Sequence, residues 1–152
     1  MKKIYILLVL LVSIVVACKS RENNKEDTTI AIIGKWYWVK QVYRSYTNNQ
    51  LTNEDTYTDF SLGSYFEFGE NSKFKEFSVE QNYREYLGTY RIGEDGTKLF
   101  IKRDVGPKED IYTITKLEKN QLIIYWVNTE INGDPNGQHV TYKGEREYTL
   151  RK

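Results

Sequence analysis

The sequence predicts an all-β protein, an up-and-down antiparallel β-barrel of eight strands. From residue 30 onward, aromatic and β-branched residues recur in short runs whose large side chains fall on alternate positions. Gly, Asn and Asp separate these runs, and the two prolines, Pro107 and Pro135, lie among turn residues. Because short strands at this spacing pair with their neighbours, we expect a meander, and closing the meander into a barrel removes its exposed edges.

Each predicted strand is an alternating run that ends at a turn signal. In the first strand, Trp36 and Trp38 share one face, while Lys35 and Lys40 suit solvent. The turn at residues 94–97 contains a glycine that can take positive φ. We expect strands over residues 36–46, 65–68, 74–79, 83–92, 99–103, 111–117, 122–129 and 139–150.

The weak point of the predicted meander is the polar stretch from Asn48 to Gly63. Its residues, NNQLTNEDTYTDFSLG, include few apolar side chains and no clear alternation. We expect a long loop there, carrying either a short helix or a lid over the barrel.

We expect a targeting signal over residues 1–17. Lys2 and Lys3 supply positive charge, and the apolar run that follows them, residues 4–16, is shorter than the roughly 20 residues that span a bilayer. We therefore expect the segment to be removed. It ends at Cys18, the single cysteine of the chain, which cannot form an internal disulfide. Residues 19–29 contain no apolar side chain, so we expect residues 18–29 to form a modified cysteine and a flexible tether.

The tetrapeptide Val15-Val16-Ala17-Cys18 resembles the lipobox of bacterial lipoproteins. The resemblance implies cleavage before Cys18 and attachment of a diacylglyceryl group to its thiol, which makes the membrane the first expected partner. Lys19 stands where an inner-membrane retention signal would show aspartate, which favours the outer membrane and leaves its periplasmic and surface faces open. The alternative interpretation is an ordinary secretory signal with an incidental cysteine.

Charge excludes one class of partner. Loss of Lys2 and Lys3 takes the 22 basic side chains to 20, against 21 acidic ones. Nucleic-acid-binding proteins carry a clustered basic surface, so we expect no nucleic-acid partner.

The stretch from Ile33 to Arg151 is similar to the lipocalin-like domains of small lipoproteins in Gram-negative bacteria, so residues 30–152 are the expected barrel domain. The segments that carry the resemblance are Gly34-Lys35-Trp36, Tyr65-Phe66-Glu67-Phe68, Gly88-Thr89-Tyr90-Arg91-Ile92, Leu99 with Ile101, Tyr112-Thr113-Ile114, Leu117 with Leu122, and Tyr148-Thr149-Leu150-Arg151. It implies that a basic residue of the last strand, Arg151 or less favourably Arg146, packs across Trp36 and closes one end of the barrel.

Two functions fit such a barrel, because eight strands enclose either a filled core or room for one small ligand. In the first, the barrel binds a small apolar or amphipathic ligand. In the second, the barrel is filled and the protein contacts an envelope partner through outer tyrosines and the 48–63 loop. The candidate lining residues are Trp36, Trp38, Phe66, Phe68, Phe74, Tyr90, Leu99 and Trp126.

The sequence predicts no enzyme, metal site or cofactor. His139 is the single histidine, and no second histidine or spare cysteine completes a zinc site. No Gly-x-Ser-x-Gly motif marks a nucleophile. Glu54, Asp55 and Asp59 could act as general acid and base if their loop folded over the barrel. A solvated loop explains these three acidic residues more simply.

Overall fold

The computed structural model describes residues 25–60, 63–79, 82–133 and 139–152. The predicted signal peptide, Cys18 and residues 19–24 of the predicted tether lie outside the described residues.

The described residues form one nine-stranded antiparallel sheet, with a helix over residues 25–32 and a 3-10 turn, η1, at Glu70–Ser72. The strands are β1 (Gly34–Thr47), β2 (Gln50–Tyr57), β3 (Tyr65–Phe68), β4 (Lys73–Ser78), β5 (Arg84–Ile92), β6 (Lys98–Arg103), β7 (Glu109–Glu118), β8 (Gln121–Gly133) and β9 (His139–Arg151). All eight predicted strands are present, with ends that shift by a few residues.

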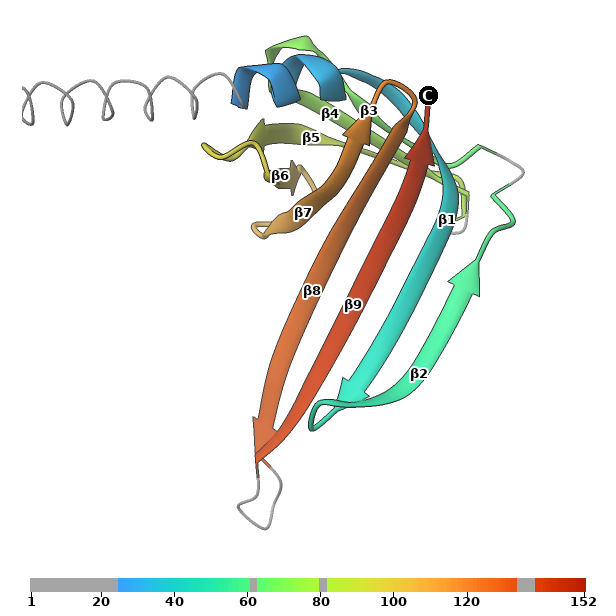
Figure 1. The fold of residues 1–152 in the computed structure, drawn as a ribbon, viewed down its shortest axis with the longest axis vertical. Coiled ribbons are helices and arrows are strands. Elements are labelled where there is room, and N and C mark those ends of the chain that lie inside the picture. Colours follow the sequence, from blue (N-terminus) through green and yellow to red (C-terminus); the bar gives the residue numbers. More distant parts are fainter. Residues whose placement is uncertain (1–24, 61–62, 80–81, 134–138) are drawn as a thin grey trace, which may run out of the picture.

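The predicted barrel is confirmed. Strands β3 to β9 pair in chain order, and β1 pairs with both β3 and β9, which closes eight strands into a ring (Figure 1). β2 is an additional ninth strand that pairs with β1 outside this ring.

The prediction of a loop over residues 48–63 is wrong at Gln50–Tyr57, which form β2. Asn48 and Asn49 both have positive φ, 49° and 64°, as a two-residue hairpin turn requires. β2 is exposed along almost its whole length. An edge strand with solvent on both faces needs no apolar alternation, so the sequence pattern carried no strand signal.

The helix over residues 25–32 takes up the second part of the segment that we expected to be a flexible tether. It covers one end of the barrel (Figure 1). Ile32 is fully buried there, and its carbonyl oxygen accepts a hydrogen bond of 2.6 Å from the Trp36 indole nitrogen. None of the described helices is long and apolar enough to cross a membrane.

The apolar core lies at the end that the helix covers. Gly34 begins β1 there with a φ of 125°, a conformation that glycine adopts more readily than other residues. The core residues are Ile32, Trp36, Trp38, Phe66, Phe68, Phe74, Tyr90, Ile92, Leu99, Ile101, Tyr112, Leu122, Ile124, Tyr148 and Leu150. Several of their rings pack edge to face; the Trp38 ring centroid lies 5.3 Å from those of both Phe66 and Tyr148.

At the other end, three long strands continue past the short ones. β3 pairs with β1 only over Gly34–Tyr37, and β2 takes the same edge of β1 from Gln41 onward. Strands β2, β1, β9 and β8 therefore run on as a four-stranded sheet beyond the closed ring (Figure 1). Because β2 pairs only with β1 among the described strands, the barrel wall is open beside it.

Candidate binding site

The inward faces of the strands change from apolar to polar at one level of the barrel. On β4, the buried Phe74 is followed two residues later by Glu76; on β6, Ile101 is followed by Arg103. Asp110 pairs with Ile101 across the β6–β7 ladder. Since residues two apart share a face, these polar side chains continue the inward rows of the core.

Above the core lies a hollow of about 380 Å³. Its lining residues are Trp38, Gln41, Glu76, Ser78, Tyr86, Arg103, Val105, Asp110, Tyr112, Trp126, Arg146 and Tyr148. Val105, which is 71% exposed, shows that the hollow reaches the surface. We call this space the mouth hollow.

Two further hollows adjoin the mouth hollow. One, of about 580 Å³, lies between β1 and residues 56–60 and shares Gln41 and Arg146 with it. The other, of about 380 Å³, lies on the four-stranded sheet and shares Trp126 and Arg146 with it. Arg146 lines all three hollows.

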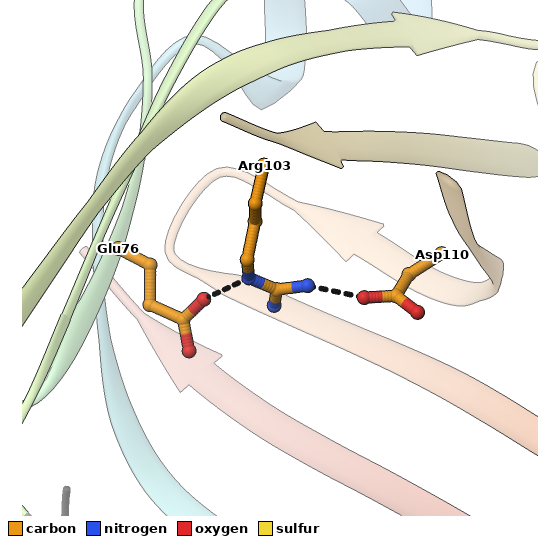
Figure 2. Close-up of polar contacts among 3 residues, drawn as sticks. All are labelled: Glu76, Arg103 and Asp110. Carbon is orange, nitrogen blue, oxygen red and sulfur yellow. Dashed lines mark hydrogen bonds and ion pairs between the residues drawn. The ribbon is translucent and has the colours of Figure 1, made fainter. Parts of the chain in front are cut away.

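One arginine of the mouth hollow is held by two carboxylates. Arg103 donates through Nε to Glu76 at 2.6 Å and through Nη1 to Asp110 (Figure 2). It also donates a hydrogen bond to the Tyr112 hydroxyl. The positive charge of Arg103 is therefore already paired with neighbouring groups of the protein.

Burial shapes the acid–base behaviour of this cluster. Burial raises the pKa of Glu76, although the Arg103 charge opposes the shift. Burial by itself would lower the pKa of Arg103, but Tyr112 and Glu76 outweigh it, so that pKa lies above its usual value. Burial also raises the pKa of Tyr112, which keeps this hydroxyl protonated at neutral pH.

The other arginine, Arg146, is held differently. Its guanidinium lies 5.6 Å from the ring centroid of Tyr43 and 5.3 Å from that of Trp126. It donates a hydrogen bond to the Tyr148 hydroxyl. Among the described residues, no carboxylate lies within ion-pair distance of Arg146, in contrast to Arg103.

Trp38, one of the residues that line the mouth hollow, carries an unpaired and fully buried donor. The side chain is 8% exposed, and its indole nitrogen has no hydrogen-bond partner. It is the single buried side-chain nitrogen or oxygen in that condition among the described residues. Since leaving a buried donor unpaired costs about 1 to 3 kcal/mol, this group calls for an explanation.

The eight predicted lining residues divide into two sets. Trp38 and Trp126 line the mouth hollow. The other six lie in the packed core and line none of the three hollows: Trp36, Phe66, Phe68, Phe74, Tyr90 and Leu99. The barrel is thus filled at its closed end and hollow at its mouth, which is neither of the two extremes that the sequence suggested.

Sequence reasoning missed the polar side chains of the mouth hollow. It assigned strand faces by following the large apolar residues. It passed over polar residues two positions further on the same face, such as Glu76 after Phe74 and Arg103 after Ile101. A polar residue that continues an inward row was the available signal.

The basic residue that packs across Trp36 is Lys152, one position after the predicted Arg151. The ammonium of Lys152 lies 4.6 Å from the Trp36 ring centroid and donates to the carbonyl oxygen of Ala31. Strand alternation explains the shift, because Leu150 is buried and Arg151 is exposed on the opposite face. Arg146 lies at the mouth, away from this closed end.

The acidic residues of the expected 48–63 loop do not converge on one site. Glu54 pairs with Arg44 at 2.6 Å, Asp55 accepts from the amide of Asn53, and Asp59 lines the 580 Å³ hollow. The described residues include no group of three or more His, Cys, Asp or Glu side chains that could hold a metal ion. The side chain of His139 lies outside the described residues.

No protein-family model matches the chain, and no curated protein matches it in sequence. Among solved structures, it is similar to a polyisoprenoid-binding domain from Saccharophagus degradans implicated in plant cell wall breakdown. The two share 5% sequence identity with a TM-score of 0.39, over 78% of this chain and 98% of that domain.

Proposed function

We propose that this protein is a lipid-anchored, non-enzymatic binding protein of the cell envelope, held at the outer membrane, whose barrel takes a small amphipathic molecule in the mouth hollow. The observation that carries the binding function is the mouth hollow itself. Its volume of about 380 Å³ falls in the range of roughly 300 to 1,000 Å³ of ligand sites.

The walls of the mouth hollow favour an amphipathic ligand over a purely apolar one. Trp38, Trp126 and Tyr148 offer ring surface, while Glu76 and Arg146 lie on the same walls. An apolar chain would leave the polar groups facing it without water, at a cost in free energy. A ligand with one polar end avoids that cost.

Native mass spectrometry of protein purified from its own cells tests the binding function. We expect a small molecule to copurify with the wild type. Gln41→Trp should lower the bound fraction severalfold, because Gln41 lines both the mouth hollow and the 580 Å³ hollow, and an indole would fill part of each.

Lys40→Trp is the matched control, since Lys40 is the exposed neighbour of Gln41 and lines none of the three hollows. It should leave the bound fraction unchanged. A wild type that carries no small molecule, or equal occupancy in both variants, would reject the binding function.

The anchor rests on the lipobox resemblance of residues 15–18. Two or three acyl chains hold a protein stably on a membrane, at about 0.8 kcal/mol for each buried CH₂, where one chain does not. We expect labelled palmitate to enter the wild type and not Cys18→Ser, as read by autoradiography after gel electrophoresis. Equal labelling of the two would show that Cys18 is not the attachment point.

A second candidate function is docking of an envelope protein on β2. Among the described strands β2 pairs only with β1, so its other edge offers unpaired backbone groups to an added strand. Leu51 and Tyr57 are 54% and 53% exposed on this strand. The same mass measurement separates the two functions, since docking adds the mass of a protein and ligand binding that of a small molecule.

A further inference from the structure

We infer that Arg146 is the anion-binding residue of the mouth hollow, so that the ligand is an alkyl chain with a carboxylate or phosphate head. The inference rests on the proposed function and adds the chemical class of the ligand's polar end.

Position is the first argument. Arg146 is exposed and lines all three hollows, so this residue can be reached from the closed barrel and from the open sheet beside it. Tyr43 on β1 and Trp126 on β8 place rings near it from the two strands that flank β9. Gly144, two residues earlier on the same face, has no side chain; a Cβ there would lie 3.8 Å from the Tyr43 ring.

Unused donors are the second argument. A guanidinium carries five N–H groups at its edge, whereas a ring contact engages its face or its charge. Tyr148 accepts one hydrogen bond from Arg146, and no carboxylate among the described residues lies within ion-pair distance. The remaining edge donors suit a carboxylate or a phosphate, which can accept two parallel bonds from one guanidinium.

The other charged groups of the mouth hollow are paired with one another, so they are not the groups that bind the head of the ligand. Glu76 and Asp110 both accept from Arg103 (Figure 2). A cationic ligand would therefore have to displace Arg103 from its carboxylates. An anion needs to displace nothing at Arg146.

The tryptophan rings of the mouth hollow are an independent observation at the same site. Both Trp38 and Trp126 supply ring surface for an alkyl chain. The wall thus combines a cation that has no carboxylate partner among the described residues with apolar ring surface.

The test is titration of the purified full-length chain, followed by tryptophan emission, with three probes that share an alkyl chain: octanoate, octyl phosphate and 1-octanol. All are used below their micelle concentrations. We expect octanoate or octyl phosphate to bind at least about tenfold more tightly than 1-octanol, as a charge-assisted hydrogen bond to the Arg146 guanidinium allows. Tighter binding of octanoate points to a fatty acid, and tighter binding of octyl phosphate to a phospholipid head group.

Arg146→Gln should raise the dissociation constant of the anionic probe about tenfold and leave that of 1-octanol unchanged. Arg151→Gln is the matched control, because Arg151 is an exposed arginine at the end of the same strand and lines none of the hollows. It should change neither constant. Circular dichroism checks that Arg146→Gln folds, and the salt dependence of the wild type tests the same charge without any substitution.

The outcomes separate the two proposals. If all three probes bind equally, with no salt dependence, the mouth hollow binds ligands but Arg146 does not select an anion, and this inference is overturned. If Arg146→Gln and Arg151→Gln weaken the anionic probe equally, the effect is one of net charge and the inference also fails. If no probe binds the wild type, the proposed binding of amphipathic molecules fails with it.

Discussion

Trp36→Ala is expected to lower the free energy of unfolding by about 3 to 5 kcal/mol, as the truncation of buried aromatic side chains does. Trp36 is fully buried in the core at the closed end. Its indole nitrogen donates to the carbonyl oxygen of Ile32, and the Lys152 ammonium lies over its ring. One side chain therefore joins the covering helix, the first strand and the end of the last strand. Urea unfolding followed by circular dichroism measures the change.

Tyr37→Ala is the control for this prediction. Tyr37 is the next residue on β1, is 43% exposed and makes an edge contact with Tyr65. Its loss should cost about 1 kcal/mol or less, which is the range of an aromatic pair. If Trp36→Ala costs less than about 0.5 kcal/mol, far below the range for buried rings, then Trp36 does not hold the closed end together.

Arg103→Met is expected to lower the free energy of unfolding at pH 7 by about 3 kcal/mol, because it leaves a buried carboxylate without its cation. Glu76 is 4% exposed, and its Oε2 lies 2.6 Å from the Arg103 Nε. Asp110 is more exposed and can return to solvent, so most of the cost falls on Glu76. Glu76→Gln should cost less, since Arg103 keeps its bond to Asp110 and the amide needs no counter-charge.

The loss in free energy of unfolding that Arg103→Met causes should become smaller as the pH falls. Burial already raises the pKa of Glu76, and loss of the Arg103 charge removes the main influence that lowers it. A carboxyl whose folded pKa lies above its unfolded value of about 4.3 costs the fold stability as the pH rises through that interval. The difference between wild type and variant should therefore be smaller at pH 5 than at pH 7. Urea unfolding at pH 5 and pH 7 measures this difference in the free energy of unfolding. The same difference at both pH values would contradict this interpretation.

Much of the barrel could be predicted from local patterns. Tyr65–Phe68 is a strand with the predicted ends, and its side chains alternate in burial. The turn after β5 behaves as its residues indicate: Gly96 has a φ of 72°, and the Asp95 carboxylate accepts from the backbone N–H of Thr97. Such features depend on residues a few positions apart, so one sequence is enough to show them.

The mouth hollow could not be predicted in the same way. Glu76, Arg103 and Asp110 stand on three different strands, and Arg146 on a fourth. Each is a polar residue in a strand, for which solvent exposure is the ordinary expectation. Only the pairing register places them together, through steps such as Ile101 opposite Asp110 and Trp126 opposite Arg146.

The sequence by itself determined the period-two alternation, the turns and therefore the closed antiparallel barrel, because burial of large apolar side chains on one face of each strand leaves few other arrangements. The tertiary structure alone decided where the core stops. The long strands β1, β8 and β9 extend past the short ones, so the inward rows continue beyond the apolar layer into a space with polar walls. The strand lengths and the register set that boundary, and neither can be read from the residues of a single strand.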